Sequence, residues 1–155
     1  MHLTYKHTLY ACYTGYITQA IVNNLAPLLF IVFQTQYGLN FEMVGRLILI
    51  NFGTQILADF LAVKVVDKIG YRASAVLAHI FSTVGLVLLG VLPQICPSPY
   101  AGLIIAVVIY ALGGGLLEVL VSPIVESLPG DEKASAMSLL HSFYCWGQMG
   151  VVLIS

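Results

Sequence analysis

The feature that most constrains this chain is a series of apolar runs, each about as long as a membrane-spanning helix. An α-helix needs about 20 apolar residues to cross the hydrocarbon core of a bilayer. Only 8% of the residues are charged, against about 25% in soluble domains, so the chain cannot cover a water-facing surface. We therefore predict an all-α, polytopic membrane bundle of about five spans, near 10–33, 44–66, 73–92, 100–125 and 134–154.

The positive charges indicate how this bundle is oriented. Cytoplasmic loops of membrane proteins carry an excess of Lys and Arg. With the N-terminus inside, only Arg46 falls on the outer side, and the other cations fall on the cytoplasmic side: Lys6, Lys64, Lys68, Arg72 and Lys133. We expect a multi-pass protein of the cell (plasma) membrane with a cytoplasmic N-terminus and the lipid bilayer as a partner. The net charge of −1 gives no attraction for nucleic acid.

Polar residues recur inside the spans at helical spacing. Residues four apart share one face of a helix. The second and fourth spans each carry three polar residues at that spacing, namely Asn51, Gln55 and Asp59, and Glu118, Ser122 and Glu126. The first span has Gln19 and Asn23 four apart, and the fifth contains His141 and Trp146. Four of the five spans therefore have a polar face.

Glu118 is the most costly of these residues to place in a membrane. It lies about eight residues, or about 12 Å, from the cytoplasmic end of its span. A charge at the bilayer centre costs about 3 kcal/mol or more. The carboxylate must face a water-filled cavity, find a partner or stay protonated. We interpret the polar faces as the joint lining of one wet, solute-sized cavity. Just before Glu118, the glycines at 113–115 let this helix approach a neighbour closely.

Hydrogen bonding between helices is the alternative explanation for the polar residues. Such bonds contribute about 0.6 kcal/mol each in membranes. We expect this role for Thr14, Thr18 and Ser82. For Asn51 and Gln55, hydrogen bonding between helices and lining of the cavity both stay open as roles. For Asp59, lining of the cavity and a structural pair with another residue both stay open.

The connection "VVDKIGYRAS" between the second and third spans resembles the signature loop of the major facilitator superfamily. The family pattern is a glycine, three residues, Asp, a basic residue, any residue, Gly, any residue and a basic residue. Asp67, Lys68, Gly70 and Arg72 match this pattern, and Val63 replaces the leading glycine. The resemblance implies a loop that holds cytoplasmic helix ends together and makes charge contacts that change between transport states.

A second resemblance involves "GGGLLEVLVSPIVESLP" followed by "MSLLHSFYCWG". These segments are similar to the fourth and fifth helices of the fucose and hexose proton-symporter branch of that superfamily, and "VNNL" resembles its first helix. The resemblance implies a sugar site lined by Asn23, Asn24 and His141, with Glu118 handling sugar and proton. It also implies that residues 1–155 are the incomplete N-terminal bundle of a twelve-helix transporter, whose partner is a missing C-terminal half.

The first span departs from that branch in one respect. The branch tends to have an aspartate shortly after the two asparagines, where this chain has Ala26 and Pro27. Proton coupling through the first span is therefore not expected. Glu118 is left as the main candidate for proton coupling, with Asp59 as the second.

Together these patterns predict a secondary active transporter that moves a small polar solute, for which we expect a sugar, by alternating access. Amide side chains both donate and accept hydrogen bonds, which suits a polyhydroxylated ligand. Trp146 has two interpretations, stacking on a sugar ring or packing within the bundle. The predicted substrate-binding residues are Asn23, Asn24, Asn51, Gln55, Glu118, Ser122, His141 and Trp146.

Two other classes of protein compete with this prediction. One is a small five-helix structural or regulatory membrane protein without transport activity, although the unflanked ending "VVLIS" leads us to expect a fragment. The other is an intramembrane enzyme or metal protein using Glu118, Glu126 and His141. No metal-ligand spacing occurs on one helix and no nucleophile is placed beside a base, so we expect no enzyme, no cofactor and no metal.

Overall fold

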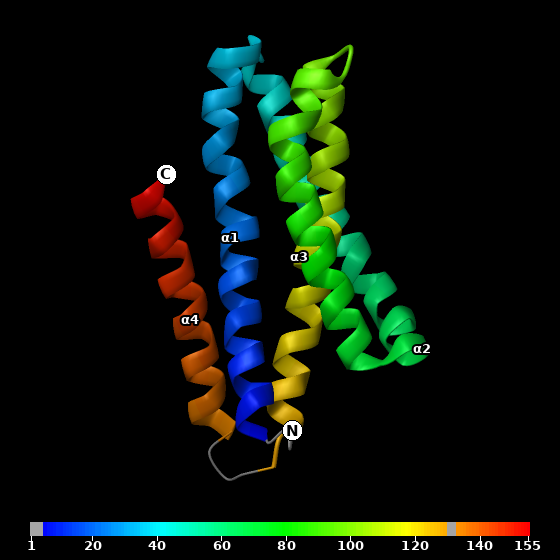
Figure 1. Cartoon of the computed structure of the whole chain (residues 1–155), viewed down its shortest axis with the longest axis vertical. Helices are drawn as coiled ribbons and strands as arrows, with labels where there is room; N and C mark the ends of the chain where they lie inside the picture. The colour runs from blue at the N-terminus through cyan, green and yellow to red at the C-terminus, as the bar shows by residue number, and fades with distance from the viewer. Residues whose placement is uncertain (1–4, 130–132) are drawn as a thin grey trace.

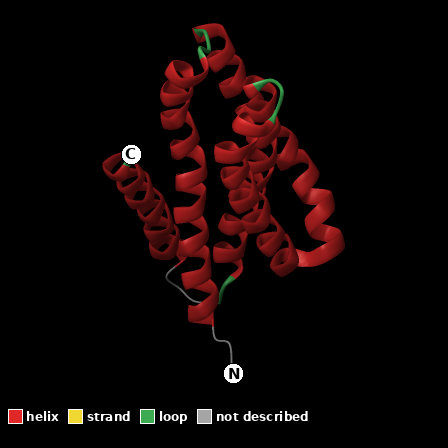
Figure 2. Ribbon diagram, turned by 45° about the horizontal axis from the view of Figure 1, so that its top comes forward, coloured by secondary structure: helices red, strands yellow, loops and turns green. Residues whose placement is uncertain are grey.

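The computed structural model of the protein describes residues 5–129 and 133–155. Long helices run up and down beside one another, with short turns between them at both ends of the bundle (Figure 1). Within the described residues there is no strand (Figure 2). The helices are α1 (Tyr5–Tyr37), α2 (Phe41–Ile95), α3 (Pro99–Ser127) and α4 (Lys133–Ile154). Each is long and apolar enough to cross a membrane.

α2 consists of two membrane helices that meet at Gly70. Its 55 residues would span about 80 Å if straight, far more than a bilayer core of about 30 Å. Gly70 has φ 81° and ψ 160°, a conformation essentially restricted to glycine. The chain turns back at this level, and the stretch that follows runs beside α3 (Figure 1). Segments 41–69 and 71–95 are therefore two helices, and counting them separately brings the number of helical segments to the predicted number of about five.

The prediction of a connecting loop around Gly70 is wrong, because the residues on both sides of this glycine are helical. Asp67, Lys68 and Arg72 are all helical, and a single non-helical glycine makes the turn. The physical reason is that one residue at a glycine-only φ and ψ reverses the chain, so both helices continue up to it.

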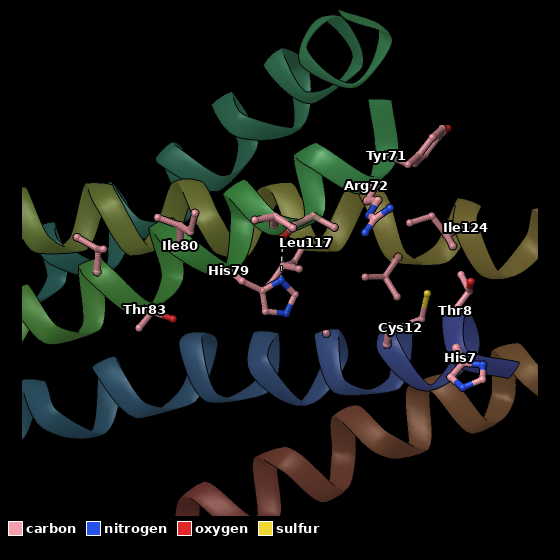
Figure 3. Close-up of a pocket in the computed structure, with 16 residues that line it drawn as sticks. His7, Thr8, Cys12, Tyr71, Arg72, His79, Ile80, Thr83, Leu117 and Ile124 are labelled. Atoms are coloured by element: carbon pink, nitrogen blue, oxygen red, sulfur yellow. Dashed lines mark hydrogen bonds between the residues drawn. The ribbon is translucent and has the colours of Figure 1, made fainter. Parts of the chain in front are cut away.

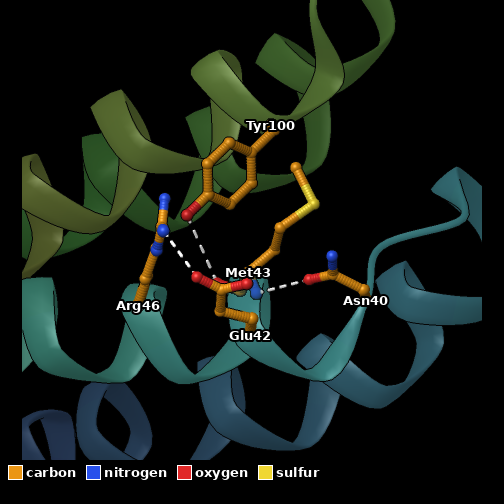
Figure 4. A network of polar contacts seen from close by, with 5 residues as sticks. All are labelled: Asn40, Glu42, Met43, Arg46 and Tyr100. Atoms are coloured by element: carbon orange, nitrogen blue, oxygen red, sulfur yellow. Dashed lines mark hydrogen bonds and ion pairs between the residues drawn. The ribbon is translucent and has the colours of Figure 1, made fainter.

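The start of α2 is fixed by its cap and by a contact with α3 (Figure 4). The Asn40 side chain accepts a hydrogen bond from the backbone N–H of Met43 at 2.8 Å. Glu42 occupies the first turn, where a negative charge is favoured by the helix dipole, and pairs with Arg46. The Tyr100 hydroxyl donates to the carbonyl of Met43 at 3.3 Å, which ties the beginning of α3 to the beginning of α2.

Close packing of α3 against both halves of α2 depends on glycine. A Cβ added to Gly113 would lie 2.5 Å from the backbone nitrogen of Ser82, and one added to Gly115 would lie 3.0 Å from the carbonyl oxygen of Gln55. Gly85 in turn lies directly against the backbone of Tyr110. These contacts confirm that the glycines before Glu118 let α3 approach its neighbours closely.

The buried side chains form two apolar clusters, one above the other along the bundle. One contains Cys12, Ala62 and Leu120, and the other contains Phe30, Leu47 and Leu103. On α1 the first cluster stops at Tyr16 and the second starts at Val22. The level between them is therefore left for side chains of another kind.

α4 is the least enclosed helix. It packs mainly on α1, at the side of the bundle (Figures 1 and 2). Only Leu140 and Val151 of this helix are buried.

The basic residues are divided between the two ends of the bundle as the charge pattern predicted. Arg46 lies near the end where α2 begins, with Asn40 and Tyr100. The opposite end carries Lys6, Lys64, Lys68, Arg72 and Lys133.

Candidate transport site

Polar side chains from all four helices meet in a region that reaches from the first apolar cluster, where Tyr16 and Tyr144 lie, into the gap between the two clusters. We call this group the polar cluster. It is held together by hydrogen bonds between residues that are far apart in sequence. Its members are Tyr16, Gln19, Asn23, Gln55, Asp59, Glu118, Ser122 and Tyr144.

Glu118 is tied to α1 while its side chain stays open to the outside of the bundle. The Gln19 side-chain amide donates to a carboxylate oxygen of Glu118 at 3.0 Å. Gln19 is buried, whereas Glu118 is exposed. A hydrogen bond to an ionised acceptor is stronger than one between neutral groups. One oxygen of Glu118 is therefore positioned by the protein, and the side chain can still contact a ligand.

Asp59 lies on the part of α2 that packs against α3 beside Glu118: Ala58, the residue before it, faces Gly115, three residues before Glu118. The Asp59 side chain is half-buried. Its Oδ1 atom is buried without a hydrogen-bond partner among the described residues. Leaving a buried acceptor unsatisfied costs about 1–3 kcal/mol. The structure thus brings together the two residues predicted to handle protons.

A second chain of hydrogen bonds links α2, α1 and α4. The amide of Gln55 donates to the Asn23 side-chain oxygen at 2.8 Å. The amide of Asn23 donates to the Tyr144 hydroxyl at 3.4 Å. Gln55 is buried, while Asn23 and Tyr144 are half-buried. Gln55 therefore orients Asn23, and the polar atoms of Asn23 and Tyr144 remain partly accessible.

Tyr16 connects the polar cluster to the end of α3 and to α4. Its hydroxyl and the Ser122 hydroxyl lie 2.8 Å apart and share a hydrogen bond. Its ring meets the imidazole of His141 edge-on, with centroids 5.6 Å apart. His141 is exposed and lies at the border of the cluster.

Besides His141, three predicted substrate residues lie outside these hydrogen bonds. The Asn24 amide donates to the carbonyl of Ala20 on its own helix at 2.7 Å. Asn51 is 3% exposed, and its side-chain oxygen has no partner among the described residues. Trp146 is 60% exposed and packs its ring against Phe143 at a centroid distance of 5.3 Å.

Thr14 and Thr18 differ from the expectation that they join helices. Their hydroxyls donate to backbone carbonyls four residues earlier on α1, those of Tyr10 and Thr14. A threonine hydroxyl reaches the preceding turn of its own helix without needing a neighbour. The hydroxyl of Ser82, for which the same role was expected, is buried without a hydrogen-bond partner among the described residues.

Three members of the polar cluster were not among the predicted site residues. Gln19 and Tyr16 precede Asn23 by four and seven residues, and Tyr144 follows His141 by three. Each therefore shares a helix face with a residue that was predicted. Gln19 was already on the polar face of the first span, and extending the faces of the first and fifth spans by one turn would have added Tyr16 and Tyr144.

The expectation of one closed cavity around Glu118 is not met by these helices. Glu118 lies on an exposed face, and it does not line the cavity of about 830 Å³ between α1, α2 and α3. Tyr16, Gln19 and Gln55 of the polar cluster are buried between the helices, whereas Glu118 at its edge is exposed.

The residues of the predicted conformational loop lie together at the Gly70 end. Asp67, Lys68, Gly70 and Arg72 are all exposed. Arg46 and Glu42 form the one ion pair found among the described residues. The charged side chains of Asp67, Lys68 and Arg72 therefore form no ion pair with one another.

Long apolar helices with a hydrogen-bonded polar layer at mid-depth define a multi-pass membrane protein. The family model of the Major Facilitator Superfamily matches residues 12–155, nearly the whole chain. The chain therefore belongs to the major facilitator superfamily and is a transporter of that class. Comparison with the curated proteins gave no match, and comparison with the solved structures gave none either.

Proposed function

We propose that the polar cluster binds a small polyhydroxylated solute, a sugar, during alternating access. The observation that carries this proposal is that Glu118 is exposed at mid-depth while Gln19 holds one of its oxygens. Its partly accessible neighbours add an amide at Asn23 and hydroxyls at Ser122 and Tyr144. Sugar hydroxyls both donate and accept, so they can use a carboxylate, an amide and hydroxyls together.

The exposed position of Glu118 supports a second half-bundle as the partner. A charged side chain facing lipid at this depth would cost about 3 kcal/mol or more. Transporters built from two halves bind their substrate near the bilayer midplane, at the interface between the halves. We propose that a C-terminal half covers this face and completes the substrate site. Asp67, Lys68 and Arg72 would then make contacts that change as the halves move.

Proton coupling in this proposal uses both carboxyl groups. Two negative charges held close together at mid-membrane repel each other. Binding of a proton to the Glu118–Asp59 pair relieves that repulsion. Because Glu118 also contacts the solute in this proposal, binding of the proton changes the affinity for the solute. The placement in the cell membrane with a cytoplasmic N-terminus belongs to the same proposal, and it rests on the basic residues gathered at the Gly70 end.

Sugar uptake into cells that express the complete transporter, this half-bundle together with the proposed C-terminal half, tests this function. Glu118→Gln keeps the shape of the side chain and removes its charge. We expect it to abolish proton-driven accumulation of labelled hexoses or fucose, while exchange of sugar across the membrane continues.

Glu126→Gln is the matched control, because Glu126 lies two turns further along the same helix and is exposed at its end. This variant should accumulate sugar normally. If Glu118→Gln accumulates sugar with unchanged pH dependence, Glu118 does not couple protons. If no sugar is taken up by the unsubstituted protein, the sugar assignment is wrong.

A further inference from the structure

Polar side chains of neighbouring helices line up turn by turn in the polar cluster. Segment 41–69 of α2 and helix α3 begin at the same end of the bundle, so they run in the same direction (Figure 1). Nε2 of Gln55 lies 3.5 Å from the position that a Cβ on Gly114 would take. Asp59 and Glu118 follow these two residues by four positions each, which is about one helical turn. Gln55 and Gly114 therefore form a first level, and Asp59 and Glu118 form a second level one turn further along both helices.

Helix α1 passes the same two levels in the opposite direction (Figure 1). At the first level, the amide of Gln55 donates to the side-chain oxygen of Asn23 at 2.8 Å, which joins α2 to α1. Gln19 precedes Asn23 by four positions on α1, so it lies at the second level. Helix α1 thus presents Gln19 to Asp59 in the way that it presents Asn23 to Gln55.

Two buried acceptor atoms at the second level lack a donor among the described residues. They are Oε1 of Gln19 and Oδ1 of Asp59. The nitrogen of the same Gln19 amide donates to Glu118 at 3.0 Å. An amide oxygen and an ionised carboxylate both accept hydrogen bonds and cannot donate one to each other. A proton on Asp59 turns one of its oxygens into a donor, and a hydrogen bond to Gln19 then satisfies both buried atoms.

The two carboxyl groups differ in what a proton would satisfy. Glu118 is exposed and already accepts the N–H of Gln19. Asp59 is half-buried, and its buried oxygen has no donor within the part of the chain that the structure describes. A proton placed on Asp59 completes the hydrogen bonding of two buried atoms, whereas a proton placed on Glu118 completes neither. The geometry therefore points to Asp59 as the position of a single proton.

The charge of the two carboxyl groups is not offset by a basic side chain among the described residues. The ion pair found there joins Arg46 to Glu42 at the beginning of α2. Helices α1 and α4 bring two ionisable groups near the pair, Tyr16, which is bonded to Ser122, and His141, which is exposed. The large groove beside α1 lies elsewhere, since neither carboxyl group lines it (Figure 3). A proton fits the few oxygens at this level better than a metal ion, because hard divalent cations take about six or more oxygen ligands.

We propose that Gln19 bridges the two carboxyl groups of the proton-coupling pair. The O–H of a protonated Asp59 donates to Oε1 of Gln19, and Nε2 of Gln19 donates to an ionised Glu118. The pair then holds one proton, which Asp59 gains as an O–H bond and loses when that bond breaks, while Glu118 stays ionised and available to the solute. This inference rests on the proposed function, in which the pair couples protons, and it assigns Gln19 as the residue that positions both groups.

Infrared spectroscopy of the complete transporter, purified without sugar, tests where the proton sits. A protonated carboxyl group has a C=O stretching band that is separate from the bands of an ionised one, so its appearance can be followed as the pH is lowered. We expect one such band to be lost in Asp59→Asn and kept in Glu118→Gln. Glu126→Gln, at the exposed end of the same helix, should leave the band in place. Loss of the band in Glu118→Gln together with its retention in Asp59→Asn would overturn the proposal.

Two glutamine variants test the bridge itself. Gln19→Leu removes the acceptor of the Asp59 O–H, so the band should move to higher wavenumber, as expected for a carboxyl group that donates no hydrogen bond. Gln55→Leu replaces a similarly buried glutamine that bonds Asn23, and should leave the band in place. Equal band positions in Gln19→Leu and the unsubstituted protein, at equal helix content by circular dichroism, would overturn the bridge.

These measurements separate the bridge from the proposed function. The samples contain no sugar, so a wrong sugar assignment leaves the expected bands unchanged. If Glu118→Gln abolishes proton-driven uptake while Gln19→Leu leaves the band unmoved, the bridge alone is wrong. If no carboxyl band titrates in the unsubstituted protein, the pair holds no proton, and the bridge is overturned together with proton coupling.

Discussion

Replacing Gly115 by alanine tests the packing that positions the candidate site. Gly115 lies where α3 meets the first half of α2, and a Cβ there would come 2.9 Å from the Cβ of Ala58 and 3.0 Å from the carbonyl oxygen of Gln55. Non-bonded carbon atoms settle at about 3.5–4.0 Å. The two helices would therefore have to separate by about 0.5–1 Å. Gln55, which orients Asn23, lies on the helix that must move.

The magnitude follows from a comparison with a second glycine on α2. Overpacking of this kind costs about 1–3 kcal/mol. Alanine also favours a helix over glycine by about 1 kcal/mol, which hides part of the cost. Gly53→Ala is the matched control, because it gains the same helix preference and a Cβ there would meet nothing within 4 Å. We expect Gly115→Ala to be less stable than Gly53→Ala by about 1–3 kcal/mol.

Unfolding in mixed micelles by increasing fractions of dodecyl sulfate, followed by circular dichroism, measures this difference. The expected result is an earlier transition for Gly115→Ala than for Gly53→Ala. The reasoning is refuted if the two variants unfold at the same detergent fraction, or if Gly115→Ala unfolds later.

Three further predictions test separate parts of the structure. Gly70→Ala should destabilise the protein by about 1–3 kcal/mol, because the φ and ψ of Gly70 are restricted to glycine. Gly90→Ala is the control, since a Cβ has open space at both positions. If the two variants unfold at the same detergent fraction, the glycine-specific turn at Gly70 is wrong. Tyr110→Phe should leave the free energy of unfolding unchanged or raise it by about 1 kcal/mol, since the buried hydroxyl has no hydrogen-bond partner among the described residues. A clear loss of stability in the same unfolding assay would mean that the hydroxyl does have a hydrogen-bond partner. Tyr16→Phe and Ser122→Ala should show a coupling of about 0.6 kcal/mol in a double-mutant cycle, and strictly additive effects would mean that the two hydroxyls do not bond.

The spans and the polar faces could be predicted from sequence because both depend on local spacing. Apolar length sets the number of crossings, and a spacing of four places Gln55 and Asp59 on one face of their helix. The glycines before Glu118 indicated close packing for the same local reason. The turn at Gly70 was harder to foresee, because the charged residues around it suggest a loop while the backbone stays helical up to one glycine.

The partners of the polar residues could not be predicted, because they depend on how each helix is rotated about its axis. Gln19 and Glu118 are 99 residues apart, and Asn23 and Tyr144 are 121 apart. Nothing in the spacing within one helix selects such a pair. The exposed position of Glu118 has the same origin, since it depends on which neighbours α3 packs against and which it leaves open.

Thiol accessibility at position 118 tests most directly whether this face of the bundle meets water within the membrane. The three native cysteines, Cys12, Cys96 and Cys145, would first be replaced, and a single cysteine introduced in place of Glu118 or, as a control, of the exposed apolar Val87. A membrane-impermeant methanethiosulfonate reagent reacts with thiols that water reaches. The account predicts rapid labelling at position 118 and slow labelling at position 87. Labelling at position 118 as slow as at position 87 would contradict it.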